Sequence, residues 1–248
     1  MNYNWDWSVF FKSTGIGSEI YLDWFIAGLG WTIALSLSAW VIALLLGTVL
    51  GVMRTLPGRF AARAATVYVE LFRNVPLLVQ LFIWYFIVPD WLPEKIELWF
   101  KQDLHPATSA FISVTVCLGL FTAARVCEQV RTGIQALPRG QSMAAYALGL
   151  RLPQVYRKVL LPQAFRIIIP PLTSEFLNVF KNSSVASLIG LMELLAQTKQ
   201  TAEFTANLFE AFTLATVIYF VLNMGLMLVM RTVEKRVRVP GLIALGGK

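Results

Sequence analysis

A few charged and polar residues lie inside otherwise apolar stretches of this 248-residue sequence, where they could bind a polar ligand. Glu175 and Lys181 interrupt the apolar segment 167–192. A charged group at the centre of a bilayer costs at least about 2.5 kcal/mol, so such groups usually face a protein cavity. The spacing leaves the two side chains roughly 120° apart on a helix, so we expect no direct bond between them.

The polar residues around Glu175 form one stripe along the expected helix, because Glu175 and Asn182 lie only about 20° apart in projection. Two interpretations are open. In the first, the stripe lines a cavity and meets a substrate. In the second, it packs against a partner subunit, or Glu175 and Lys181 bond to other spans. The residues assigned to a substrate pathway in this segment are Glu175, Asn178, Lys181, Asn182 and Ser183.

A second polar group lies in "RNVPLLVQ", at the start of the apolar segment 66–89. Pro76 has no backbone N–H, and we expect it to break the first turns of this span. Such breaks are tolerated where the backbone lines a cavity or is covered by protein. We therefore predict that Arg73, Asn74 and Gln80 line the inner part of a path. The alternative is that Arg73 extends to the cytoplasmic interface.

The sequence offers no residues for catalysis at these sites. No G-x-x-x-x-G-K-[ST] motif for binding nucleotide phosphates is present. The one histidine, His105, excludes a Ser-His-Asp arrangement and a His/Cys metal cluster. We therefore expect no catalytic residue, metal or cofactor, and three classes remain: a transporter, a channel or a structural membrane subunit.

The elements that must hold these residues are apolar membrane spans. Hydrophobic residues make up 57% of the chain and charged residues 14%, and a span needs roughly 20 consecutive apolar residues. Five segments qualify, at 24–53, 66–89, 107–124, 167–192 and 211–230. We predict an all-α integral membrane protein with five transmembrane helices.

Lysine and arginine give the orientation of these spans. The loops 54–63, 125–166 and 231–248 carry 15 of these residues, and the segments on the other side carry four. The positive-inside rule then places the N-terminus outside and the C-terminus in the cytoplasm. The net charge of +7 belongs to this cytoplasmic face, so nucleic acid is not an expected partner. The predicted divisions are a periplasmic or interfacial segment 1–23, a transmembrane domain 24–230 and a cytoplasmic tail 231–248.

The segment 140–165 is a basic, half-apolar insertion between the third and fourth spans. Ser142 is expected to cap one short helix and Gly149 to end it. Pro153 suits the first position of a second helix, which would run to Pro162. An apolar face of this second helix, formed by Val155, Val159 and Leu160, suits a groove on a partner protein or a layer of anionic lipid headgroups.

The pattern Ala144-Ala145-x3-Gly149-x9-Val159-x-Leu161-Pro162 resembles the EAA loop of permease subunits of binding-protein-dependent ABC transporters. Met143 departs from it, because the family usually has Glu there. The blocks 72–86, 128–141 and 161–190 resemble the polar amino-acid permeases, so the resemblance covers nearly the whole chain. Among these permeases the sequence is most similar to those of bacterial glutamate/aspartate importers.

The resemblance implies a type I ABC importer fold in the bacterial inner membrane and a subunit that is not itself an enzyme. It implies that the loop docks on a separate ATPase and passes its closure to the spans. The coupling residues would be Met143, Ala144, Ala145, Gly149, Val159, Leu161 and Pro162, with any polar contact of the usual Glu lost at Met143.

The partners implied are a sister permease, expected to form a heterodimer, two ATPase copies and a periplasmic amino-acid-binding protein. Relatives that carry basic substrates often have an acid where this chain has neutral Asn182, which favours an acidic amino acid as the substrate. The alternatives are an ABC permease for another polar amino acid, an autonomous channel or secondary transporter, and a structural membrane subunit.

Overall fold

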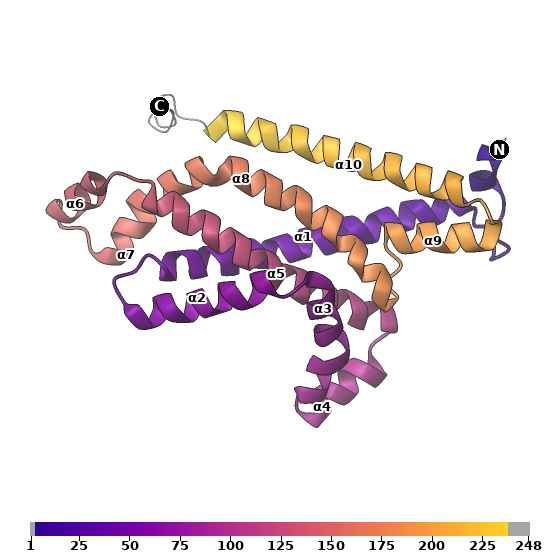
Figure 1. Cartoon of the computed structure of the whole chain (residues 1–248), viewed down its shortest axis with the longest axis horizontal. Helices are drawn as coiled ribbons and strands as arrows, with labels where there is room; N and C mark the ends of the chain where they lie inside the picture. The colour runs from indigo at the N-terminus through magenta and orange to yellow at the C-terminus, as the bar shows by residue number, and fades with distance from the viewer. Residues whose placement is uncertain (1–2, 238–248) are drawn as a thin grey trace. The chain divides into compact units, whose positions relative to one another are not determined.

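The computed structural model describes residues 3–237, which are helical apart from turns and an isolated bridge between Ser13 and Ile20 (Figure 1). The chain divides into two compact units. The first comprises the described parts of Met1–Ala39, Leu77–Leu118 and Asn178–Gly225, and the second those of Trp40–Pro76, Gly119–Leu177 and Leu226–Lys248.

Several helices are long and apolar enough to cross a membrane. Three of them are α1 (Tyr21–Met53), α5 (Pro106–Gln135) and α10 (Leu208–Val237). Two further candidates are interrupted helices: α2 (Arg59–Asn74) continues after a break into the helix from Leu77, and α8 (Leu161–Asn182) is followed after a break by α9 (Leu194–Thr205). The first break lies at Val75 and Pro76, as Pro76 predicts.

The helices extend beyond the apolar runs from which the spans were predicted. α5 continues to Gln135 and includes the first part of the predicted loop 125–166. α10 continues to Val237, and the rest of the predicted tail 231–248 lies outside the described residues. α9 and α10 are separated only by Ala206 and Asn207. Charged residues end an apolar run, but they do not end a helix. α5 ends only near Pro138, which cannot continue the helical hydrogen bonds.

The described part of the predicted N-terminal segment, residues 3–23, packs within the first unit. Trp7–Phe11 form one short 3-10 helix, and the rings of Trp5 and Trp7 are stacked with centroids 5.3 Å apart. The hydroxyl of Tyr3 donates to the buried carboxylate of Glu210 at 2.5 Å. This hydrogen bond is the main cause that raises the pKa of Tyr3 to about 12. The segment is thus tied to the first turn of α10.

The break before α9 is stabilised by the buried carboxylate of Glu193, which is the N-cap of this helix. Glu193 is fully buried, and its side chain accepts hydrogen bonds from the N–H groups of Leu195 and Ala196 and from the Tyr219 hydroxyl. Thr32 of α1 accepts the N–H of Leu194. Buried backbone N–H groups need hydrogen-bond partners, and these contacts supply them at the start of α9.

Glycine spacing brings α1 close to α5 in the second unit. A Cβ atom on Gly47 would lie 2.6 Å from Cβ of Val126, and one on Gly51 would lie 2.6 Å from Cβ of Val130. Only a missing side chain permits this approach. The Gly47-x3-Gly51 spacing therefore serves the close packing of α1 against α5 within this chain.

Candidate functional site

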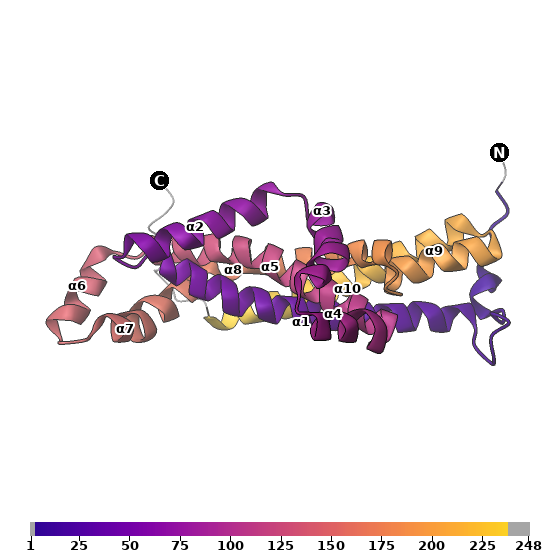
Figure 2. The same cartoon turned by 90° about the horizontal axis from the view of Figure 1, so that it is seen from below.

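The segment expected to couple to a partner lies at one end of the second unit in both views (Figures 1 and 2). It consists of α6 (Arg139–Ala147), α7 (Leu152–Val155) and a wide π-helical turn (Tyr156–Leu160) that leads into α8. The two short helices joined by a bend are therefore present as predicted.

Gly149 makes the bend in the way that the sequence suggests. Its φ is +79°, in the left-handed region where glycine is favoured. Its N–H donates to the Tyr146 carbonyl at 2.9 Å, and the N–H of Leu150 donates to the Ala145 carbonyl at 3.2 Å. These two bonds form a Schellman motif that ends α6. The bend is thus fixed by the backbone of α6 itself.

Two details of this segment differ from the prediction. Ser142 does not cap α6, which begins at Arg139 after Pro138, and its hydroxyl donates to the Arg139 carbonyl. Pro162 does not end the second helix, because the chain continues through it into α8. The π-helical turn just before Pro162 shifts the hydrogen bonds, since the Leu161 N–H donates to Tyr156 five residues back. A proline without N–H fits after such a turn.

The apolar residues expected to face a partner divide into two groups. Val155 and Leu160 are buried in the core of their own unit, so the predicted outward face of the second helix is wrong. These two side chains pack against other apolar residues of the same unit. Burial of this apolar surface within the chain stabilises the fold and leaves the side chains unavailable to a partner protein. The exposed apolar surface lies on α6 and its end, where Met143 is 68% and Leu148 is 82% exposed.

The remaining coupling residues follow the same division. Ala144, Gly149 and Pro162 are exposed, Val159 and Leu161 are half-buried, and Ala145 is buried. The segment is also tied to the end of α1, because the Tyr156 hydroxyl donates to the Thr55 carbonyl at 2.9 Å. A displacement of α7 and the π-helical turn after it would therefore also displace the loop that follows α1.

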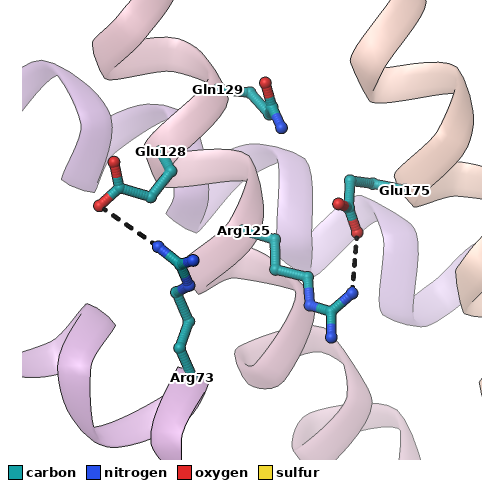
Figure 3. Close-up of a pocket in the computed structure, with 5 residues that line it drawn as sticks. All are labelled: Arg73, Arg125, Glu128, Gln129 and Glu175. Atoms are coloured by element: carbon teal, nitrogen blue, oxygen red, sulfur yellow. Dashed lines mark ion pairs between the residues drawn. The ribbon is translucent and has the colours of Figure 1, made fainter.

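A polar pocket of about 270 Å³ lies in the second unit (Figure 3). It is lined by one residue of α2, three of α5 and one of α8: Arg73, Arg125, Glu128, Gln129 and Glu175. Two ion pairs cross it. Arg125 Nη1 lies 3.5 Å from Glu175 Oε2, and Arg73 Nη1 lies 3.9 Å from Glu128 Oε1. Both distances are longer than a tight bidentate pair of arginine and carboxylate.

The Arg125–Glu175 pair presents charges of both signs to the pocket. The Glu175 side chain is 15% exposed and that of Arg125 is 39% exposed. The Arg125 guanidinium lies 4.9 Å from the centre of the Phe121 ring, a cation–π contact that holds it in place. A ligand with one cationic and one anionic group could exchange with this loose pair without leaving either charge unpaired.

The structure brings together some of the predicted pathway residues. Arg73 and Glu175 share the pocket, and Asn74 lines a neighbouring cavity with Arg73. Glu175 pairs with Arg125 of α5, which is the contact with another span that our second interpretation expected. The other predicted residues belong to the first unit: Gln80, Asn178, Lys181, Asn182 and Ser183. Of these, Lys181 is exposed, while Ser183 is buried and donates to the Phe180 carbonyl at 2.8 Å.

Three residues of the pocket were not predicted from the sequence. Arg125, Glu128 and Gln129 fell within the predicted cytoplasmic loop 125–166. A signal was available, because positions i, i+3 and i+4 share one face of a helix. No proline or glycine interrupts the sequence between the third span and Gly133, so these side chains could have been placed on a continued helix.

Comparison with known proteins decides the family. Residues 43–239 match the family described as "Binding-protein-dependent transport system inner membrane component". This match covers well over half of the chain. The chain belongs to this family of membrane transport components.

Individual relatives agree with this assignment. The chain is 52% identical over 248 residues, covering 100% of both proteins, to glutamate/aspartate import permease protein GltJ of Escherichia coli strain K12. It is 32% identical over 234 residues to glutamate/aspartate import permease protein GltK of E. coli O6:H1, covering 94% of this chain and 99% of that protein.

Solved structures give the fold of the permease. A crystal structure of an amino acid ABC transporter with histidines has a TM-score of 0.73 and 30% identity, covering 87% of this chain and 95% of that one. The MetNI methionine ABC transporter in an inward-facing form has a TM-score of 0.70 at 20% identity, covering 88% and 98%, and supports the fold alone. The prediction of an all-helical permease of an ABC importer is confirmed.

Proposed function

We propose that this chain is a permease subunit of an ABC importer that moves glutamate and aspartate across the bacterial inner membrane into the cytoplasm. The observation that carries the proposal is the 52% identity to GltJ, which extends from end to end of both proteins. Identity at this level over all the spans favours the same substrate class as well as the same fold.

The chemistry of the pocket fits an acidic amino acid. Glutamate and aspartate each carry one ammonium and two carboxylate groups. Glu175 would accept the ammonium, and Arg125 would take a carboxylate, for which the planar guanidinium is well suited. The neutral Asn182 adds no further negative charge beside Lys181 on α8.

The coupling segment supports an arrangement driven by a separate ATPase. In this proposal five spans place the N-terminus outside and the basic segments inside, and the ATPase docks on the exposed residues of α6 around Met143 and Leu148. The absence of a nucleotide-binding motif from the sequence agrees with ATP hydrolysis by another subunit.

The relatives also suggest the partners. GltJ and GltK are both named glutamate/aspartate import permease proteins, and this chain matches both. We therefore infer a heterodimer with a sister permease, two ATPase copies and a periplasmic binding protein for acidic amino acids.

Reconstitution tests the proposal. The chain would be co-produced with its candidate sister permease and ATPase, placed in lipid nanodiscs, and supplied with binding protein. ATP hydrolysis should rise with binding protein carrying aspartate or glutamate, and much less with unloaded protein. Equal stimulation by glutamine or arginine would remove the acidic-substrate assignment. Reporter fusions before residue 3 and after residue 237 would test the orientation. The N-terminal reporter should lie outside and the C-terminal reporter in the cytoplasm, and two reporters on the same side would contradict the five-span arrangement.

A further inference from the structure

Three arginines share the carboxylate of Glu128 in the second unit. Arg54 hydrogen-bonds to Glu128 Oε1, and Arg131 reaches Oε2 through Nε at 2.9 Å and Nη2 at 2.8 Å. Arg73 Nη1 lies at 3.9 Å from Oε1, the longest of the three contacts. One carboxylate thus faces three cations, and Arg73 has the weakest share of it.

Exposure separates Arg73 further from the other two arginines. Its side chain is 54% exposed, against 15% for Arg54 and 27% for Arg131. If Arg73 turned to another anion, Glu128 would keep two hydrogen-bonded cations and would not be left as an uncompensated charge. Exchange of the Arg73 contact therefore carries little of the penalty of breaking a buried ion pair.

The pair formed by Arg73 and Glu128 lies where two polar cavities meet. Both residues line the pocket of about 270 Å³ that contains Arg125 and Glu175. Both also line a second cavity of about 380 Å³, together with Arg54, Val69, Glu70 and Asn74. The second cavity offers arginine and glutamate side chains, as the first one does. A ligand that fits the chemistry of the first cavity meets the same chemistry in the second.

We propose that Arg73 is a second binding station for the carboxylate of a dicarboxylic amino acid, which it takes from the Arg125 pocket into the second cavity. This inference rests on the proposed function, which supplies the anionic substrate. The incoming carboxylate replaces Glu128 as the partner of Arg73, and Glu70, one turn earlier on α2, lies in the same cavity for the ammonium group. After the exchange, Arg73 has the substrate carboxylate as its partner and Glu128 keeps Arg54 and Arg131.

A cysteine at position 73 tests the station directly. The native thiols Cys117 and Cys127 are both buried, so the unsubstituted chain gives the background reaction. The complete transporter with Arg73→Cys in nanodiscs is treated with a positively charged methanethiosulfonate reagent during ATP turnover, with and without aspartate-loaded binding protein. Arg63→Cys, at an exposed position on the same helix, is the matched control.

We expect aspartate transport to slow modification of the cysteine at 73 by several-fold and to leave the cysteine at 63 unchanged. The same rate with and without aspartate at position 73 would overturn the proposal. Failure of the reagent to react there would also overturn it, because position 73 would then not line a water-filled cavity.

The charge of the attached group gives an independent measurement. Arg73→Cys should lose about tenfold or more in aspartate uptake, the scale of a hydrogen bond to a charged group. An aminoethyl adduct should restore uptake, and a sulfonatoethyl adduct should not. Equal uptake with both adducts contradicts a carboxylate station. If the cysteine variant fails to assemble, Arg73→Lys and Arg73→Gln replace it. Equal uptake by these two variants would likewise contradict a carboxylate station at position 73.

The unsubstituted transporter separates this inference from the proposed function. If aspartate-loaded binding protein fails to stimulate its ATP hydrolysis, the importer assignment fails whatever happens at position 73. If stimulation occurs and the cysteine at 73 is neither protected nor sensitive to charge, only the second station fails.

Discussion

Gly149→Ala should weaken coupling through a purely conformational effect. Gly149 has a φ of +79°, and a Cβ atom built on it would meet nothing within 4 Å. The substitution therefore adds no clash, and its cost is the left-handed conformation itself, about 1–2 kcal/mol for a residue with a Cβ. A cost of that size lowers the ratio of bent to unbent segment by a factor of about 5–30.

The assay is ATP hydrolysis stimulated by loaded binding protein, measured against ATPase concentration. The apparent affinity for the ATPase should fall by a similar factor in Gly149→Ala and by less in Gly149→Asn, since asparagine tolerates this conformation better. Gly140→Ala is the matched control, because Gly140 lies in α6 with ordinary φ and open space. Wild-type behaviour of Gly149→Ala, or an equal loss in Gly140→Ala, would refute the reasoning.

Two further predictions concern packing and the pocket. Gly47→Ala should lower the midpoint of thermal unfolding of the purified complex, because its Cβ would lie 2.6 Å from Cβ of Val126 and overpacking costs about 1–3 kcal/mol. Gly30→Ala is the control, because a Cβ at Gly30 meets open space. An unchanged midpoint in Gly47→Ala, or an equal loss in Gly30→Ala, would contradict this prediction. Arg125→Gln and Glu175→Gln should each reduce aspartate uptake about tenfold or more while assembly persists, since each removes a charged partner of the substrate. Normal uptake by either variant would show that the substituted residue does not contact the substrate.

Local signals in the coupling segment were strong enough to predict much of it. Gly149 ends α6, and two short helices follow one another as expected. Pro162 was misread, because a proline stops an α-helix only when the preceding turn is regular. The π-helical turn at Tyr156–Leu160 absorbs the missing hydrogen bond, and its formation depends on packing of Tyr156 and Leu160 in the core, which the local sequence does not specify.

The ends of the helices were less predictable than the existence of the spans. Hydropathy reports where a helix leaves an apolar environment, whereas the helix itself continues until a breaker or a cap. Glu193 illustrates the difference. From the sequence alone, an acidic residue exposed in a loop cannot be distinguished from one that caps a buried helix. The burial of Glu193 depends on Thr32 and Tyr219 from distant parts of the chain.

The pocket depended most on long-range contacts. Glu175 was recognised from its cost inside a span, but its partner Arg125 lies fifty positions earlier and was assigned to a loop by its charge. Arg73 and Glu128 are likewise brought together only by the packing of α2 against α5. Such pairs follow from tertiary packing, and a single sequence without the fold does not contain them.

The most direct test of the account is uptake of radiolabelled aspartate into proteoliposomes that contain the chain, its sister permease and the ATPase. The account predicts accumulation against a concentration gradient that requires loaded binding protein and internal ATP, and that is lost when residues 143–162 are deleted. Aspartate flux through this chain alone without ATP would identify an autonomous channel or secondary transporter and contradict the account.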